Sequence, residues 1–231
     1  MILLKATTVF FALTLNFIDV GQSKFPTTKN YEKLPSVEIK DHGQFIERKY
    51  PSVKFACTEE EYNVEDEGQM EIPENMDEKR LKKWVKTYMK NKYKPSNRMF
   101  KRLFGYIKGS NSQKQKISMT VPVLSKIFPV TGASVKKEMC FYLPEQFQDN
   151  PPEPTNKEIW VKEHPEIVVY VKRFGGWAFG DNVWIEKGSA FTEELSEKDL
   201  NFSEEYFMTA SYDSPWKTKN RTNEIMFEKL V

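Results

Sequence analysis

The chain has 231 residues, with 35 basic and 33 acidic side chains and a formal net charge of +2. This balance excludes a case for nucleic-acid binding from overall charge. The length is enough for one large or two small domains with a substantial core. A core of that size makes disulfide stapling optional.

The first 23 residues are typical of a signal peptide: a positive start, an apolar run over residues 6–18, and small residues before a cleavage point after Ser23. The apolar run is too short to predict a membrane span, and no later segment reaches the roughly eighteen apolar residues of a spanning helix. We therefore expect residues 24–231 to form a single domain that is secreted and extracellular.

Two kinds of covalent modification fit an exported protein. Cys57 and Cys140 tend to pair in an oxidising compartment, but two buried, unpaired thiols are an equal alternative, since sequence does not reveal the distance between their Cα atoms. Asn201 in N-F-S and Asn220 in N-R-T have the form of N-glycosylation acceptors. Such sequons also arise by chance.

Two segments of the chain predict the same pair of strands. Residues 45–59, FIERKYPSVKFACTE, and residues 159–176, IWVKEHPEIVVYVKRFGG, each alternate apolar and polar side chains around a proline. Pro51 and Pro165 occupy the same place in the two segments and predict a tight bend. The chain therefore contains an internal duplication.

The rest of each copy predicts a helix and two further strands. In the first copy a helix over residues 96–109 precedes the strand KISMTVPV at 116–123, and in the second a helix over 181–198 precedes strands near the C-terminus. We place repeat one at about residues 44–123 and repeat two at about 136–231. Two such units predict an α+β fold with one antiparallel sheet structure and two helices against it.

Residues 59–94 are predicted to be an insertion in the first repeat. Ten acids and no base occur from Glu59 to Glu78, and twelve bases and no acid from Lys79 to Lys108. The segment 76–93 predicts a basic amphipathic helix with an apolar face, which consists of Leu81, Trp84, Val85, Tyr88 and Met89. That face could meet a membrane surface or a protein partner, or it could dock on the domain beside the acidic strip, which we favour.

Catalysis has little support in the sequence. His42 and His164 are the only histidines, and neither belongs to a nucleophile motif or has the spacing of metal ligands. No pair of carboxylates stands out as a general acid and base. We predict that the protein is not an enzyme.

A binding surface is better supported. The predicted first-repeat helix carries Phe100 and Phe104 on one face with Lys101 beside them, and the later loop SYDSPWKTKNR carries Trp216 and Lys217. Large apolar side chains flanked by cations suit a flat, hydrophobic, doubly anionic ligand. An apolar helix face is nevertheless more often part of a core than of a pocket.

Four segments in order, KISMTVPV, FYLPEQFQDNPPEPTN, VVYVKRFGG and ASYDSPWKTKNRTNEIMF, resemble the motifs of the SOUL haem-binding proteins. The resemblance runs from about Gln44 to the C-terminus and is interrupted by the insertion. It implies a distorted antiparallel barrel of two similar halves with two long helices. It also implies non-catalytic binding of haem or a related porphyrin, here by a secreted carrier or scavenger.

The resemblance also implies a location for the ligand, between the first-repeat helix and the loop that joins the last two strands. The site residues carried over by motif, with the neighbouring lysine of the helix, are Phe100, Lys101, Phe104, Trp216 and Lys217. Some members have a histidine where this chain has Lys49, so the remaining candidates for an axial ligand of haem iron are His164 and His42. The alternative function is a protein or membrane-surface interaction module that keeps the fold without haem and uses the helix 76–93.

Overall fold

The computed structural model describes residues 31–67, 76–91, 94–129 and 134–230. The predicted signal peptide lies outside this part of the chain. Within the described residues no helix is both long and apolar enough to cross a membrane. The elements, in chain order, are β1 (Glu32–Lys33), β2 (Val37–Asp41), β3 (Ile46–Tyr50), β4 (Val53–Asn63), α1 (Val64–Glu67), α2 (Glu78–Lys90), α3 (Pro95–Ile107), β5 (Thr120–Val121), β6 (Val123–Pro129), β7 (Ser134–Tyr142), the 3-10 turn Glu145–Phe147, β8 (Trp160–His164), β9 (Ile167–Phe174), α4 (Asp181–Glu197), β10 (Phe207–Ser211) and β11 (Asn223–Glu228).

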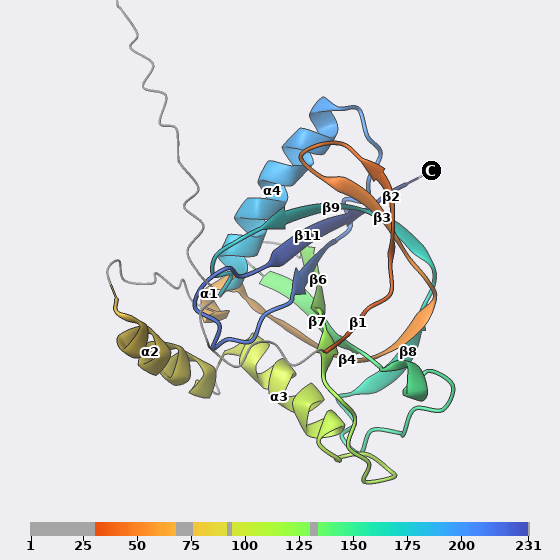
Figure 1. Cartoon of the computed structure of the whole chain (residues 1–231), viewed down its shortest axis with the longest axis vertical. Coiled ribbons are helices and arrows are strands. Elements are labelled where there is room, and N and C mark those ends of the chain that lie inside the picture. The colour runs from red at the N-terminus through yellow and green to blue at the C-terminus, as the bar shows by residue number, and fades with distance from the viewer. Residues whose placement is uncertain (1–30, 68–75, 92–93, 130–133, 231) are drawn as a thin grey trace, which may run out of the picture. The chain divides into compact units, whose positions relative to one another are not determined.

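One curled, antiparallel sheet of nine strands organises the fold, in the order β2-β3-β9-β11-β10-β6-β7-β4-β8. Figure 1 shows α3 and α4 on one face of this sheet and α2 to its side. The predicted α+β class and the distorted, barrel-like antiparallel sheet are thereby confirmed.

The two strand-strand-helix-strand-strand units exchange their first strands. β3 pairs with β9 of the second unit, and β8 pairs with β4 of the first. The exchange takes place at the two bends predicted from proline, where Tyr50 lies opposite Ile167 and Val53 lies opposite His164. The two proline bends thus join the repeats into one sheet.

Each face of the sheet carries its own hydrophobic core, because side chains alternate along every strand. The helix-side core contains Met99 and Leu103 of α3 and Phe191 of α4. The core on the opposite face contains Phe55, Cys57 and Cys140 among others, and no helix residue.

The two long helices present apolar stripes to the sheet. In α3 the buried positions Met99, Leu103 and Tyr106 follow helical spacing. Pro95 begins this helix, at a position where the backbone N–H has no partner within the helix, so its absence in proline costs no hydrogen bond. In α4, Gly188 faces β11 so closely that an added Cβ would lie 3.4 Å from Ile225 Cδ1. A larger residue at that position would push α4 from the sheet.

Two strands extend across boundaries that the sequence predicted for the repeats and the insertion. β4 continues to Asn63 and pairs with β7 along its length, so the insertion begins after residue 63 and not at 59. β7, residues 134–142, completes the first unit by pairing with β4 and β6, so the second repeat begins after it and not at 136. The acidic residues of β4 concealed its alternation, although Glu59 pairs with Lys136 of β7 and Glu60 pairs with Arg98 and Arg102 of α3.

The segment KISMTVPV is not one strand. Thr120 and Val121 form β5 in a separate parallel pair with β1, and Val123 begins β6. Pro122, which follows a cis peptide bond, has no N–H to donate to a ladder, so it divides the segment. Alternation alone did not reveal this break.

Candidate functional site

The described residues line three cavities. The largest, of about 740 Å³, lies on the helix side between α4 and strands β6 and β10, and none of the predicted site residues lines it. The second, called the helix-side cavity, of about 150 Å³, lies between α3 and the β10–β11 loop (residues 212–222), with α2 and residues 178–180 at its edge. The interior cavity, of about 180 Å³, lies on the opposite face beside the two proline bends. Ser125 of β6 lines the last two.

The wall of the helix-side cavity combines aromatic and polar side chains. Phe100 comes from α3, Tyr88 and Met89 from α2, and Phe179 from the segment before α4. The rings of Tyr88 and Phe179 lie 4.9 Å apart. The cavity is therefore completed by the helix that the sequence identified as an insertion.

A buried ion pair forms the polar part of this cavity. Lys137 of β7 donates to Asp181 Oδ1 at 2.7 Å and to Ser96 Oγ at 2.9 Å. Tyr62 donates to Asp181 Oδ2 at 2.5 Å. Because both charges are buried and satisfied by each other, this pair orients α3 and α4 more than it attracts a ligand.

Arg221 organises the β10–β11 loop. Its Nη1 donates to the carbonyl oxygens of Ser214 and Lys217, at 2.8 Å each, and its guanidinium lies 4.4 Å from the ring centre of Trp177. Burial lowers the pKa of Arg221, with the nearby Asp213 opposing the shift. Its Nε is buried and has no hydrogen-bond partner among the described residues, which leaves one donor at a cavity-lining side chain.

The predicted aromatic residues of α3 lie at this cavity. Phe100 lines it and packs on Phe141 of the core, and Phe104 stacks on Phe100 with ring centres 5.7 Å apart. Phe104 is 39 % exposed. Lys101, also on α3, is exposed to solvent.

The predicted loop residues lie on the rim and not in the wall. Asp213 and Pro215 line the cavity, whereas Trp216 is 49 % exposed. Lys217 donates to Asp213 Oδ1 at 2.6 Å. The structure thus brings the helix and the loop together as expected, but it gives Lys217 an internal acid as a partner.

The neighbouring arginines of α3 are also engaged. Arg98 and Arg102 both pair with Glu60 of β4, and Arg102 also reaches Glu158. Lys108, at the end of α3, places its Nζ 5.1 Å from the ring centre of the exposed Phe104.

Neither histidine lines the helix-side cavity. His42 Nε2 lies 2.8 Å from Glu47 Oε1, and its ring stacks on Phe45 at 4.6 Å. His164 lines the interior cavity instead. The structure therefore does not bring either predicted axial ligand to Phe100 and the loop.

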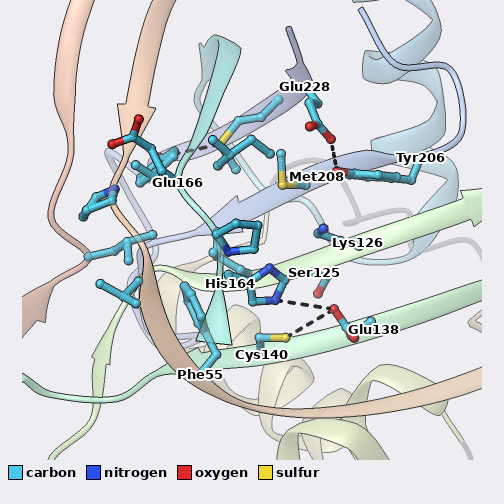
Figure 2. Close-up of a pocket in the computed structure, with 18 residues that line it drawn as sticks. Phe55, Ser125, Lys126, Glu138, Cys140, His164, Glu166, Tyr206, Met208 and Glu228 are labelled. Atoms are coloured by element: carbon cyan, nitrogen blue, oxygen red, sulfur yellow. Dashed lines mark hydrogen bonds and ion pairs between the residues drawn. The ribbon is translucent and has the colours of Figure 1, made fainter. Parts of the chain in front are cut away.

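Figure 2 shows the interior cavity, in which His164, Glu138 and Cys140 converge with Lys126 beside them. Burial lowers the pKa of His164 to about 4, and the positive charges of Lys126 and Lys162 contribute to the same shift. Its imidazole is therefore neutral at physiological pH. The remaining wall is largely apolar and includes Phe55.

Cys57 and Cys140 form a disulfide, with an S–S distance of 2.11 Å and a Cα–Cα distance of 4.1 Å. The two residues lie directly opposite each other in the β4–β7 pair. Ligand atoms of Cys57, Glu138, Cys140 and His164 lie within 4.8 Å of one another, but the disulfide occupies both sulfurs. The pairing that the sequence left open is confirmed.

The predicted glycosylation acceptors are both exposed. Asn201 follows α4, and Asn220 lies in the β10–β11 loop with a φ of 50°. Exposure meets one requirement for modification, and the modification itself stays a prediction.

Sequence reasoning did not assign Tyr88 or Phe179 to this site, and it did not identify Trp177, whose ring contacts Arg221. The segment FGGWAFG, residues 174–180, carries Trp177 and Phe179 just after a pair of glycines, and nothing local indicates that it reaches this cavity. Arg221 stands in the predicted loop, but nothing local indicates that it turns inward to Trp177.

Comparison with known proteins identifies the family. The SOUL heme-binding protein family matches residues 78–228. The mouse protein "Heme-binding protein 2" is 33 % identical over 130 residues, which are 54 % of this chain and 62 % of that protein. "Heme-binding protein 1" of Xenopus laevis is 27 % identical over 202 residues, which are 87 % of this chain and 91 % of that protein.

The chain thus spans about three fifths of the length of the mouse relative. Among solved structures, a cryo-EM structure of an EcmrR–DNA complex has a TM-score of 0.50 at 11 % identity, covering 81 % of this chain and 58 % of that one. At that identity the likeness concerns the fold alone. Since the family match covers well over half of the chain, the protein belongs to the SOUL heme-binding protein family.

Proposed function

We propose that the protein binds haem or a related porphyrin at the helix-side cavity without catalysing a reaction. The observation that carries this proposal is the meeting of α3 and the β10–β11 loop around a cavity with Phe100, Tyr88 and Phe179 in its wall. Outside the lining, Phe104 stacks on Phe100, and Trp216 follows the lining residue Pro215; both are exposed. A planar, apolar ligand gains most from aromatic surface that water now covers.

The size of the cavity determines how such a ligand would lie. At about 150 Å³ it is smaller than the roughly 300–1,000 Å³ of pockets that enclose drug-sized molecules. A porphyrin would therefore enter with one edge and cover Phe104 and Trp216 with the remainder of its face. Its propionates would form charge-assisted hydrogen bonds with the exposed ammonium of Lys101, or with Lys217 in competition with Asp213.

Iron ligation by histidine is not part of the proposal. His42 is held by Glu47, and His164 lies on the other face of the sheet. Binding through the ring face and the propionates accepts iron-free porphyrin as well as haem. Two methionines of the wall, Met89 and Met139, offer thioether sulfur, which is a known haem ligand.

The proposed setting is extracellular, as a secreted carrier or scavenger. The signal-peptide pattern of residues 1–23 and the disulfide between Cys57 and Cys140 support it, since disulfides persist in oxidising compartments. Expression of the full chain in animal cells tests this point: the proposal requires a shortened protein in the medium.

The alternative, a membrane-surface or protein interaction module that uses the apolar face of the helix 76–93, has less support. Val85 in the middle of that face is 1 % exposed, and Tyr88 meets Phe179. A face whose centre already contacts its own domain has less area left for a bilayer. This favours the docked alternative for the helix.

The test is a haemin titration followed by absorbance and by tryptophan fluorescence. We expect a shifted Soret band and quenched fluorescence, with affinity reduced in Phe104→Ser and Trp216→Ser. The matched controls are Val37→Ser and Ile39→Ser, which replace apolar residues of similar exposure on β2. The proposal would be refuted if the two control variants lost as much haemin affinity as the two site variants. It would also be refuted if the unaltered protein responded neither to haemin nor to protoporphyrin.

A further inference from the structure

The solvent face of α2 carries a row of lysines. Lys79, Lys83, Lys86 and Lys90 follow the spacing i, i+4, i+7, i+11, with Lys82 beside them, and all five are exposed. These five residues are called the lysine row. With 1.5 Å of rise per residue, the row extends about 16 Å along the helix.

Contacts on the other side of α2 fix the direction of the row. Val85 is buried, Tyr88 packs on Phe179, and Asn97 of α3 donates to the carbonyl oxygen of Tyr88 at 2.9 Å. The lysine positions lie on the opposite side of the helix from Val85 and Tyr88. The row therefore faces solvent while α2 stays attached to the domain.

Among the described residues, an acid pairs with one lysine of the row. Glu78 pairs with Lys82 at 2.6 Å, but among the described residues no ion pair joins Lys79, Lys83, Lys86 or Lys90 to an acid. Lysines elsewhere do pair, as Lys49 does with Glu166 and Lys136 does with Glu59. Like charges at i, i+4 weaken a helix, so the row costs stability that an anionic partner would offset.

We propose that the lysine row binds a sulfated polysaccharide chain of the heparin class. A linear polyanion with closely spaced sulfates can follow a straight row of cations, and lysine-rich segments of this length suit such ligands. Sulfate oxygens accept charge-assisted hydrogen bonds from ammonium groups. The proposal does not depend on porphyrin binding, because none of the five lysines lines the helix-side cavity.

The composition of the row favours a polysaccharide over two other polyanions. An interfacial membrane helix buries its apolar face in lipid, and here that face meets the domain. Proteins that bind single-stranded nucleic acid add aromatic side chains on which bases stack. The lysine face offers only flexible ammonium groups, which suit sulfates on a flexible chain.

The test is calorimetric titration of the full secreted chain with a heparin octasaccharide at several salt concentrations. The variant Lys83→Gln, Lys86→Gln, Lys90→Gln keeps good helix formers and removes three charges. The matched control, Lys40→Gln, Lys157→Gln, Lys198→Gln, removes three exposed lysines outside the row and leaves the same net charge. Circular dichroism verifies that α2 is retained.

We expect the row variant to bind the octasaccharide at least about ten-fold more weakly, with a shallower salt dependence because fewer counterions are released. The control should bind like the unaltered protein, and both should keep their haemin affinity. Equal losses in the two variants, or no binding by the unaltered protein, would overturn the proposal. Tighter binding of phosphatidylserine vesicles or duplex DNA of equal charge concentration would overturn it as well.

Discussion

Lys217 donates to Asp213 across four residues of the β10–β11 loop, with 2.6 Å between Nζ and Oδ1. The same carboxylate accepts the backbone N–H of Thr222 through Oδ2 at 2.6 Å. The lysine that family resemblance assigns to a ligand carboxylate therefore already has a partner, and a propionate must compete with Asp213 for it.

Asp213→Asn should strengthen haemin binding. The amide oxygen keeps the bond from Thr222, while the loss of the negative charge releases Lys217. Because a partly exposed ion pair contributes about 0.2–1 kcal/mol, we expect a gain of about two- to five-fold in affinity. Haemin and its dimethyl ester are titrated in parallel, and an equal gain for the ester would show that Lys217 does not meet a carboxylate.

Arg221→Met should loosen the β10–β11 loop. The variant keeps an apolar stem against Trp177 but leaves the carbonyl oxygens of Ser214 and Lys217 without their donor. Bonds from a charged donor are worth about 1.5–3 kcal/mol, so we expect a loss of about 2 kcal/mol in urea unfolding. Arg80→Met, at an exposed position of α2, should change stability by less than about 0.5 kcal/mol. A comparable loss in both would contradict this role for Arg221.

Removal of the disulfide should cost stability and leave ligand binding intact. Cys57 and Cys140 are separated by 83 residues in sequence, for which the chain-entropy treatment gives about 4.5 kcal/mol. The expected result for Cys57→Ala with Cys140→Ala is a lower Tm with an unchanged haemin affinity, because both cysteines belong to the core on the other face. If haemin binding fell while the variant remained folded, the ligand would have to lie in the interior cavity.

Stability should fall below pH 6.5 because of His164. Burial, with Lys126 and Lys162, lowers its pKa to about 4 from the ordinary 6.5. Between these values the unfolded chain takes up a proton that the folded protein does not, so stability decreases as pH falls through that window and does not change above it. The full effect is about 3 kcal/mol. Urea unfolding at pH 7 and pH 5 should show a smaller difference for His164→Gln, and an unchanged difference would remove His164 as the cause.

Much of the fold could be predicted because its signals are local. Alternation around Pro51 and Pro165 identified both strand pairs, and helical spacing identified α3 and α4. The exchange of β3 and β8 between repeats could not be predicted, since it depends on pairing between residues more than a hundred positions apart. The predicted end of β4 came too early, because consecutive acidic residues are typical of a solvent-exposed segment. Only the folded chain shows that the lysines of β7 lie beside them.

The candidate site was predictable only in outline. Resemblance placed α3 and the β10–β11 loop together, and Phe100 does line the cavity between them. Tyr88, Phe179 and the Arg221–Trp177 contact come from three separate segments that meet only in the folded chain. His164 was a plausible ligand in sequence. Side chains alternate between the two faces along a strand, and the position of His164 in β8 places it on the face opposite the helices.

Blocking one cavity at a time tests the central claim most directly. Ala178→Trp fills the helix-side cavity and Val53→Trp fills the interior cavity; each position is partly exposed and lines its own cavity. In haemin titrations of the two folded variants, we expect Ala178→Trp to lose the shifted Soret band and Val53→Trp to keep it. Loss of the band in Val53→Trp with retention in Ala178→Trp would contradict the assignment of the ligand to the cavity between α3 and the β10–β11 loop.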